Sequence, residues 1–298
     1  MKNFTDTITI VTVCDNHFVV HLAALIKSIE VNHTTDQLID FYIVEDKVDL
    51  ENKCRLDRSV TGSKLKLIWL NMQAVIPRNI ALPLDNSSFP LNVYTRLFIP
   101  YFIPASLEKV LYLDVDMIAV ADISRLWLTD LSDKMVAGVV DRSETVSSDW
   151  GGIANYKELG MDPNTKYFNS GLLLLEPKKW RNGEIPAKII AAVEKHKQFA
   201  SFPDQYGLNV VLANQWKELD RRWNSYSTGN IPDPFIIHFT GRKPIFKSYN
   251  YNAHYKNEFF KYLSQTEWKG FKPLTEINRL QKKLYNKLVK KLFPFLKK

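Results

Sequence analysis

Residues 111–116 read LYLDVD, an apolar run that ends in two aspartates separated by one residue. Side chains alternate across a β-strand, so Asp114 and Asp116 are expected on the same face, just beyond a strand at 110–113. Neighbouring carboxylates at the end of an apolar strand repel each other and lose hydration, and a divalent cation is the simplest partner that neutralises both. In open α/β sheets ligands collect beyond the carboxyl ends of the strands, which is where this pair is predicted.

Apolar, β-branched runs alternate with helix-like segments on both sides of this stretch. Strands are predicted at residues 8–13, 41–44, 65–70, 110–113, 136–140, 168–175 and 236–239. Helices are predicted at residues 19–31, 50–56, 185–196 and 205–213. This alternation is typical of a mostly parallel sheet flanked by helices, so the sequence predicts an α/β fold.

Length and composition fit one large domain with a full-sized core. The chain has 298 residues, of which 45% are hydrophobic, and no stretch approaches the roughly 18 apolar residues of a membrane-spanning helix. The N-terminal segment contains Asp6 and no small-residue cleavage site, which argues against a signal peptide. Cys14 and Cys54 are the only cysteines and are expected to be reduced thiols. A cytoplasmic location is therefore expected.

Positive charge is concentrated at the C-terminus. Residues 277–298 carry eight basic and no acidic side chains, which equals the whole formal net charge of +8, so the preceding part is formally neutral. A neutral body argues against a nucleic-acid groove. Apolar residues recur in the tail at three- and four-residue intervals, which predicts a basic amphipathic helix on an anionic membrane surface. A final helix docked on the domain, with a solvated lysine face, is the alternative.

A second polar motif, IIHFTGRKP, occupies residues 236–244. A histidine on an apolar strand is most often a core residue, but here Gly241 and Lys243 follow His238. Gly241 would let the backbone approach a phosphate closely, and Lys243 would supply a point charge for it. Two aspartates and one histidine make a mixed oxygen and nitrogen site, which suits Mn²⁺ better than Mg²⁺, although Mg²⁺ stays possible.

Taken in order, these motifs resemble glycosyltransferase family 8, which includes bacterial lipopolysaccharide galactosyl- and glucosyltransferases and the glycogenins. The matching segments are Asp15-Asn16, Tyr94-Thr95-Arg96, residues 112–116, residues 167–171, Asp204-Gln205 and residues 238–241. The resemblance implies a GT-A fold, in which a Rossmann-like half with a mixed central sheet flanked by helices merges with an acceptor-binding half. Residues 1–270 would form this domain and residues 271–298 the basic amphipathic tail.

The resemblance also implies a role for each matching position. Asp114, Asp116 and His238 would hold Mn²⁺ against the UDP diphosphate. The other donor-binding positions would be Val13, Asp15, Asn16, His17, Arg96, Val115, Asp141, Asn169, Gly241 and Lys243. Within this set, residues 13–17 would contact uracil and ribose, and Lys243 would bind the diphosphate. Gln205 would stand beside the anomeric carbon, which makes Gln205 and Asp204 the candidate catalytic residues.

The implied activity is transfer of a hexose with retention of configuration. The donor would be UDP-glucose or UDP-galactose, and the acceptor a saccharide of a cell-surface glycan such as lipopolysaccharide or capsule. A glycan or lipid-linked acceptor would fit a protein held peripherally, through its tail, at the inner face of the cytoplasmic membrane.

Other interpretations stay open at this point. A non-catalytic basic scaffold could bind membrane or nucleic acid through the tail, but it leaves the predicted metal ligands without a role. A sugar nucleotidyltransferase also combines an α/β domain with a carboxylate-bound metal, yet Cys14-Asp15-Asn16 lacks a glycine-rich phosphate loop. Arg96 and Asp204 are also consistent with pairing with each other, and Asp204 with capping the helix that follows.

Overall fold

The computed structural model describes residues 7–77, 82–83 and 91–275. The tail expected at 271–298 lies outside these ranges apart from residues 271–275. Within that short part, Leu274 forms a parallel β-bridge with Phe246, so the segment lies against the body of the protein. None of the helices formed by the described residues has the length and apolar character that crossing a bilayer requires.

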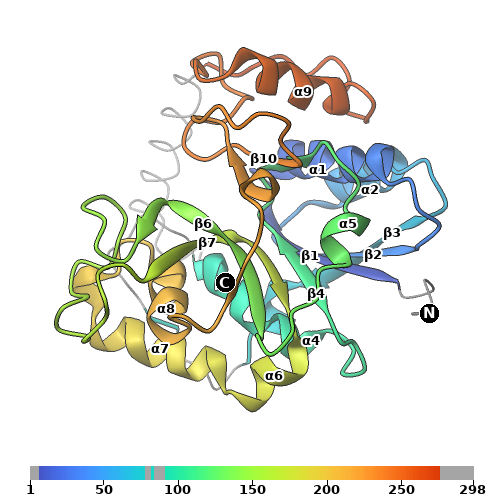
Figure 1. The fold of residues 1–298 in the computed structure, drawn as a ribbon. Coiled ribbons are helices and arrows are strands. Elements are labelled where there is room, and N and C mark those ends of the chain that lie inside the picture. Colours follow the sequence, from blue (N-terminus) through green and yellow to red (C-terminus); the bar gives the residue numbers. More distant parts are fainter. Residues whose placement is uncertain (1–6, 78–81, 84–90, 276–298) are drawn as a thin grey trace, which may run out of the picture.

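A seven-stranded mixed sheet forms the centre of the molecule (Figure 1). Its strands are β1 (Ile8–Asp15), β2 (Ile39–Asp46), β3 (Leu65–Asn71), β4 (Val110–Leu113), β6 (Val136–Thr145), β7 (Lys166–Leu175) and β8 (Lys217–Glu218). They are ordered β3-β2-β1-β4-β7-β6-β8. The first four in this order run parallel, β7 is antiparallel to β4 and β6, and β8 is parallel to β6. Because β1 and β4 are parallel neighbours, the residues that follow them meet at one edge of the sheet.

A second sheet of three strands brings a distant part of the chain to that edge. It is formed by β5 (Met117–Ala119), β10 (Ile236–His238) and β9 (Ser225–Tyr226), in the order β5-β10-β9. β10 pairs antiparallel with β5, which places His238 opposite Met117. The backbone N–H of Phe239 then donates to the carbonyl of Asp116 over 2.9 Å. This small sheet therefore joins the histidine to the aspartate motif.

Helices cover both faces of the central sheet (Figure 1). One face carries α1 (Val19–Asn32), α2 (Leu50–Ser59) and α5 (Ser124–Trp127), and α9 (Ala253–Leu263) packs against α1. The other carries the 3₁₀ helix η1 (Leu91–Phe98), α3 (Met72–Val75), α4 (Ile99–Phe102), α6 (Pro177–Asn182), α7 (Ile185–Lys195) and α8 (Pro203–Val211). Alternate residues of β4 enter the two cores: Leu111 and Leu113 face α1, whereas Val110 and Tyr112 face the opposite layer. Burial on both faces explains why the strand is apolar throughout.

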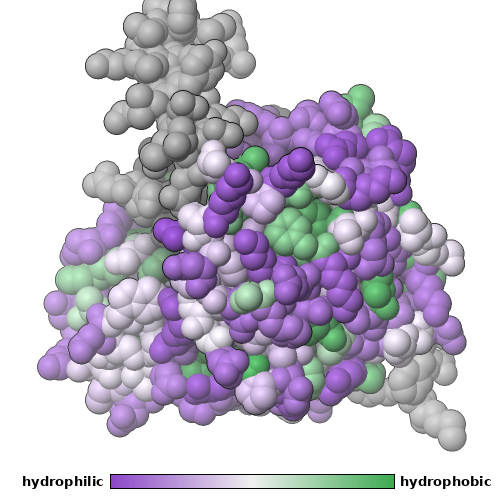
Figure 2. All heavy atoms as spheres, turned by 90° about the horizontal axis from the view of Figure 1, so that it is seen from above, coloured by the Kyte–Doolittle hydropathy of each residue, from purple (hydrophilic) through white to green (hydrophobic). Residues whose placement is uncertain are grey.

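The face of the molecule shown in Figure 2 is mainly hydrophilic, and its apolar side chains form small, separate patches. The apolar residues of the sheet and helices instead lie in the two interior cores, where all residues of β4 are buried. The exposed aromatic side chains, among them Trp150 and Tyr251, are isolated exceptions.

The predicted α/β architecture is confirmed, and the differences are at element ends and in short elements. The strand at 110–113 has the predicted bounds, whereas β6 continues to Thr145 beyond the predicted end at 140. The elements that were not predicted are the strands β5, β8 and β9, the helices α3, α4, α5, α6 and α9, and the 3₁₀ helices; among them α9, with 11 residues, is the longest. Strands of two or three residues are too short to show alternation, so only their pairing in the folded sheet reveals them.

His21, on α1, is buried in the apolar layer beside the site. Its ring lies 5.4 Å from the ring of Phe18 and 5.5 Å from that of Phe259, measured between centroids. Neither ring nitrogen has a hydrogen-bond partner among the described residues. Burial, together with the nearby charge of Lys243, lowers the pKa of His21 to about 3. The folded protein therefore holds this imidazole neutral.

His21 is expected to make stability depend on pH. An unfolded chain protonates this histidine near pH 6.5, so its contribution to stability is complete above that value and is lost as pH falls towards 3. Between pH 7 and pH 5 we expect the free energy of unfolding of the wild-type protein to fall by about 2 kcal/mol more than that of His21→Phe. Urea unfolding of both proteins at the two pH values measures the difference. If the free energy of unfolding changed equally with pH in the two proteins, His21 would not be held neutral in the folded state.

Candidate active site

Asp114, Asp116 and His238 each bring one ligand atom to within 4.8 Å of the others. The His238 Nε2 atom lies 3.2 Å from Asp116 Oδ1 and 3.9 Å from Asp114 Oδ2. The aspartates follow β4 directly, and the histidine ends β10. The structure therefore brings the three predicted metal ligands into one site at the carboxyl end of β4.

The residues around this site fit a divalent cation. Two carboxylate oxygens and one imidazole nitrogen form a mixed donor set of the kind that binds divalent metal ions. A Cβ atom at Gly171, on β7, would lie 2.7 Å from His238 Cε1, 2.8 Å from Asp114 Oδ2 and 2.9 Å from Asn169 Oδ1. Any side chain at this position would displace the ligand groups. Glycine thus leaves the space that the ligands and an ion require.

A chain of amides orients the imidazole of His238. The backbone N–H of Gly171 donates to Asn169 Oδ1 over 2.9 Å, which fixes that amide. Asn224, at the end of the 3₁₀ helix η3 (Arg221–Asn224), donates its Nδ2 to the same Asn169 oxygen over 2.9 Å. Its own oxygen then accepts from His238 Nδ1, at 2.9 Å. His238 Nδ1 therefore donates to Asn224, and this contact turns Nε2 towards the two aspartates.

Replacing Asn224 with alanine is expected to weaken Mn²⁺ binding by about 10- to 100-fold, because His238 loses the partner that orients it. Electron paramagnetic resonance of free Mn²⁺ during a titration measures this affinity without turnover. Asn182→Ala, an exposed change on α6, is the matched control and should bind Mn²⁺ like the wild type. Unchanged affinity in Asn224→Ala would refute the proposed positioning role.

Lys243 contacts one of the metal ligands. Its Nζ atom forms an ion pair with the Asp116 carboxylate and donates to the carbonyl of Phe239 over 2.7 Å. Burial alone would raise the pKa of Asp116, but Lys243 and His238 outweigh it and hold that pKa below its ordinary value. Asp116 is therefore ionised, as a metal ligand must be.

Arg96, buried in η1, links the metal site to α8. It pairs with Asp114 Oδ1 at 3.0 Å through one terminal nitrogen and with Asp204 Oδ2 at 3.2 Å through Nε. The hydroxyl of Tyr112 also donates to Asp114 Oδ1, over 2.6 Å, and the guanidinium lies 4.6 Å from the Tyr112 ring centroid. Burial raises the pKa of Asp204, and Arg96 partly offsets this. Of the interpretations left open by the sequence, the pairing of Arg96 with Asp204 is the one observed.

Gln205 belongs to a second polar cluster beside this pair. Its Oε1 atom accepts from Ser170 N at 3.0 Å and from Asn169 Nδ2 at 3.1 Å. The same Asn169 nitrogen donates to Asp141 Oδ2 over 2.9 Å, and Tyr226 donates its hydroxyl to that oxygen over 3.2 Å. Ser170 joins this cluster to the Arg96–Asp204 pair, because its hydroxyl donates to Asp204 Oδ2 over 3.0 Å, so the predicted sugar-binding residues share one continuous network.

The expected nucleotide-binding segment lies at the carboxyl end of β1. Asp15 Oδ1 accepts from the backbone N–H of His17 over 2.8 Å, which stabilises the turn before α1. Asn16 donates to Asp49 Oδ2, at the start of α2, over 2.8 Å. Val13 is half-buried, and His17 is exposed. The backbone of this segment is therefore held by its own polar side chains.

Two further predicted positions have backbone roles. Val115 is half-buried between the two aspartates. Gly241 has a φ of 75°, in the left-handed region that favours glycine, and a Cβ there would lie 3.3 Å from the hydroxyl of Tyr251. This conformation allows the chain to turn between His238 and Lys243.

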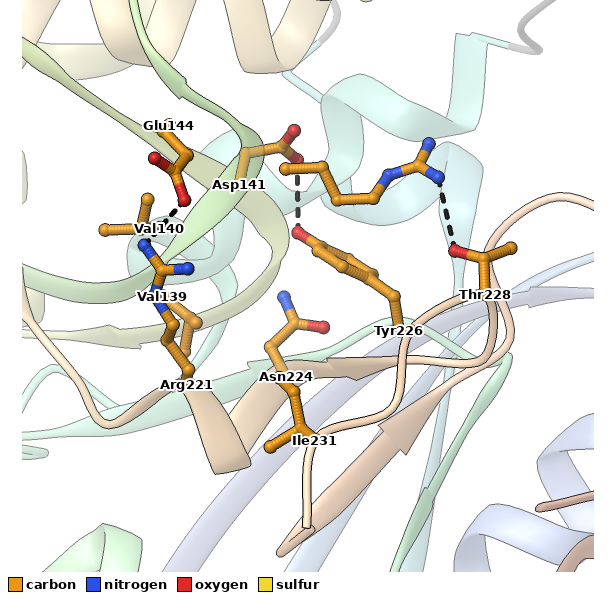
Figure 3. A pocket seen from close by; sticks show the side chains of 11 residues that line it. Val139, Val140, Asp141, Glu144, Arg221, Asn224, Tyr226, Thr228 and Ile231 are labelled. Carbon is orange, nitrogen blue, oxygen red and sulfur yellow. Dashed lines mark hydrogen bonds and ion pairs between the residues drawn. The ribbon is translucent and has the colours of Figure 1, made fainter. Parts of the chain in front are cut away.

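A pocket of about 390 Å³ opens beside the amide network (Figure 3). One wall is formed by β6, which contributes Asp141 and Arg142. The other is formed by the segment that follows η3, which contributes Tyr226 and Thr228. Asn224 also lines the pocket and contacts His238. Asn224 therefore connects the pocket to His238, one of the predicted metal ligands.

Asn224 and Tyr226 were not among the predicted site residues. They lie in a short polar run, NSYS at 224–227, just before the last apolar strand. A polar run there is compatible with any surface loop, so it carries no spacing that indicates a ligand. Only the parallel pairing of β9 with β10, which places Tyr226 opposite His238, brings these side chains to the site.

The model of the Glycosyl transferase family 8 domain matches residues 9–265. This chain belongs to glycosyltransferase family 8. General stress protein A of Bacillus subtilis (strain 168) is 27% identical to it over 280 residues, which cover 87% of this chain and 94% of that protein. A lipopolysaccharide 1,2-glucosyltransferase of Escherichia coli is 26% identical over 246 residues, which cover 76% of this chain and 69% of the relative.

The fold of this family 8 member is also found in solved structures. The galactosyltransferase LgtC, in complex with donor and acceptor sugar analogues, superposes with a TM-score of 0.70 at 24% identity. The superposition covers 88% of this chain and 99% of LgtC. The predicted GT-A fold and family are therefore confirmed. Membership identifies a glycosyltransferase, with a nucleotide-sugar donor and a saccharide acceptor, and sets aside the scaffold and nucleotidyltransferase interpretations.

Proposed function

We propose that this family 8 glycosyltransferase is a retaining, Mn²⁺-dependent hexosyltransferase. It would move glucose or galactose from a UDP-sugar to a saccharide acceptor of a cell-surface glycan, such as lipopolysaccharide or capsule. The observation that carries the proposal is the cluster of Asp114, Asp116 and His238, whose ligand atoms lie within 4.8 Å of one another. The amide network that orients His238 and the space left by Gly171 support a metal-binding role.

The leaving group of such a reaction is UDP, whose charge must be stabilised as the bond to the sugar breaks. A cation held by the three ligands would supply Lewis-acid stabilisation of the diphosphate. Lys243 is close enough to contribute, because its Nζ atom already contacts Asp116. Gly241, with its left-handed backbone, would let the loop approach the phosphates. The segment at residues 13–17 would contact uracil and ribose.

The sugar would lie against the network of Arg96, Asp204, Asn169, Gln205 and Asp141. Gln205 is a neutral amide whose oxygen already accepts hydrogen bonds from Asn169 and Ser170, so it is a poor nucleophile. A front-face route follows, in which the acceptor hydroxyl bonds to the anomeric carbon on the face from which UDP leaves. The hydroxyl proton passes to the departing phosphate oxygen, which balances the charge. The amide of Gln205 would position the sugar for this step.

Release of UDP from a panel of UDP-sugars, with Mn²⁺, Mg²⁺ or EDTA, tests the proposal. We expect slow hydrolysis of UDP-glucose or UDP-galactose in Mn²⁺, and its loss in EDTA. Release of pyrophosphate instead of UDP would indicate a nucleotidyltransferase. If no donor were hydrolysed and UDP did not bind in a metal-dependent way, the proposed function would be wrong.

The C-terminal tail supplies the proposed location. From its sequence we propose that residues 277–298 bind an anionic membrane surface and hold the enzyme at the inner face of the cytoplasmic membrane, near a lipid-linked acceptor. Truncation after Glu276 should remove binding to vesicles that contain phosphatidylserine while leaving UDP release in place. Equal partitioning of the full and truncated proteins would contradict this location.

A further inference from the structure

Arg142 stands out on the wall of the pocket beside the amide network. It lies on β6 next to Asp141 and is exposed, whereas Asp141 is buried. Its guanidinium lies 4.6 Å from the ring centroid of Trp150 and 5.6 Å from that of Tyr226. A terminal nitrogen donates to the hydroxyl of Thr228 over 3.2 Å. Two aromatic rings and a hydroxyl thus hold the guanidinium in a fixed place.

The charge of Arg142 is not neutralised by the pocket. Within the described ranges it forms no ion pair with a carboxylate. The other acidic groups of the wall are already engaged: Glu144 pairs with Arg221 at 3.0 Å, and Asp141 accepts from Tyr226 at 3.2 Å (Figure 3). The pocket therefore presents one oriented cation without a counter-ion.

The pocket is placed to hold the molecule that receives the sugar. Asp141 and Asn224 line it, and each is bonded to Asn169 in the network that we propose for the donor sugar. A neighbouring hollow shares Thr228 and reaches the exposed ring of Tyr251, so the surface extends beyond one sugar. Amide, hydroxyl and guanidinium groups next to aromatic rings are the usual lining of a site for a polar ligand.

We propose that this pocket binds the acceptor, and that the acceptor carries an anionic substituent, a carboxylate or a phosphate, that pairs with Arg142. The inference rests on the proposed function, since it identifies the substrate class of that site. A guanidinium presents its donors in a planar fork that matches both anions. The aromatic contacts orient this fork before the acceptor arrives, so less side-chain entropy is lost on binding.

Binding of simple glycosides to the full-length protein tests the inference. With the nucleotide site saturated by UDP and Mn²⁺, saturation-transfer NMR would compare methyl β-D-glucuronide, methyl β-D-glucoside 6-phosphate and neutral methyl β-D-glucoside. We expect at least one charged glycoside to bind about fivefold more tightly than the neutral one, as an exposed charge-assisted contact provides. The charged probe that binds more tightly identifies the substituent.

Arg142→Gln should remove this preference for charge. Arg125→Gln is the matched control, because Arg125 also lies over an aromatic ring, 4.4 Å from the centroid of Phe235, but does not line the pocket. Equal binding of all three glycosides, or a preference that survives in Arg142→Gln, would overturn the inference. The titration does not depend on turnover. Release of UDP from the donor alone reports on the proposed function separately.

Discussion

Asp116→Asn is expected to lower metal-dependent turnover of the UDP-sugar by about a thousandfold, which corresponds to ~4 kcal/mol of transition-state stabilisation. The amide keeps the shape of the side chain but removes the charge that faces both His238 and Lys243. Without that charge, a cation is held by one carboxylate and one imidazole only. Mn²⁺ affinity, followed by electron paramagnetic resonance, should fall together with UDP release.

The control for this change is Asp36→Asn. Asp36 is a fully exposed aspartate in a surface ion pair with Lys64, so it has the same chemistry without a place in the site. Its turnover and Mn²⁺ affinity should match those of the wild type. Full manganese-dependent turnover in Asp116→Asn would contradict the proposal that Asp116 is a metal ligand.

Arg96→Met is expected to destabilise the metal-free protein by about 3–5 kcal/mol, which is roughly 10 °C in Tm. Arg96 is buried and is the cation between Asp114 and Asp204. Its removal leaves two carboxylates near each other without a counter-charge, and one of them is fully inside the protein. Thermal unfolding in EDTA, followed by circular dichroism, measures the loss.

A second variant separates this electrostatic effect from lost packing. In the Arg96→Met background, Asp204→Asn removes one of the unpaired charges and should recover part of the stability. A double-mutant cycle of the two positions should therefore show a clear coupling energy. A free energy of unfolding for Arg96→Met within about 1 kcal/mol of the wild-type value is what an exposed ion pair would give. That result would contradict a buried ion pair of Arg96 with Asp114 and Asp204.

The local sequence pattern was enough to predict the strand that leads to the site and the two aspartates at its end. The apolar run before Asp114 predicts β4 with its observed bounds, because all four residues of the strand are buried, and the two aspartates lie in the segment that follows it. His238 lies in a motif whose residues alone favour a core histidine. The order of the motifs along the chain, as in family 8, is what predicts a role for it as a ligand.

Contacts between distant segments could not be predicted in the same way. Arg96 and Asp204 are separated by more than a hundred residues, and nothing local distinguishes a pair from two substrate contacts. Asn224 depends on the folded arrangement of Gly171 and Asn169, which sets the direction of its amide. The position of the Arg142 guanidinium also depends on the fold, because Trp150 lies in a turn after β6 and Tyr226 lies on β9.

The measurement that tests the central claim most directly is the affinity for UDP with Mn²⁺ and with EDTA, by isothermal titration calorimetry of the full-length protein. A site formed by Asp114, Asp116 and His238 predicts that UDP binds at least about tenfold more tightly when Mn²⁺ is present, because the ion neutralises the diphosphate against the two carboxylates. The same UDP affinity in Mn²⁺ and in EDTA would contradict a metal-dependent nucleotide site.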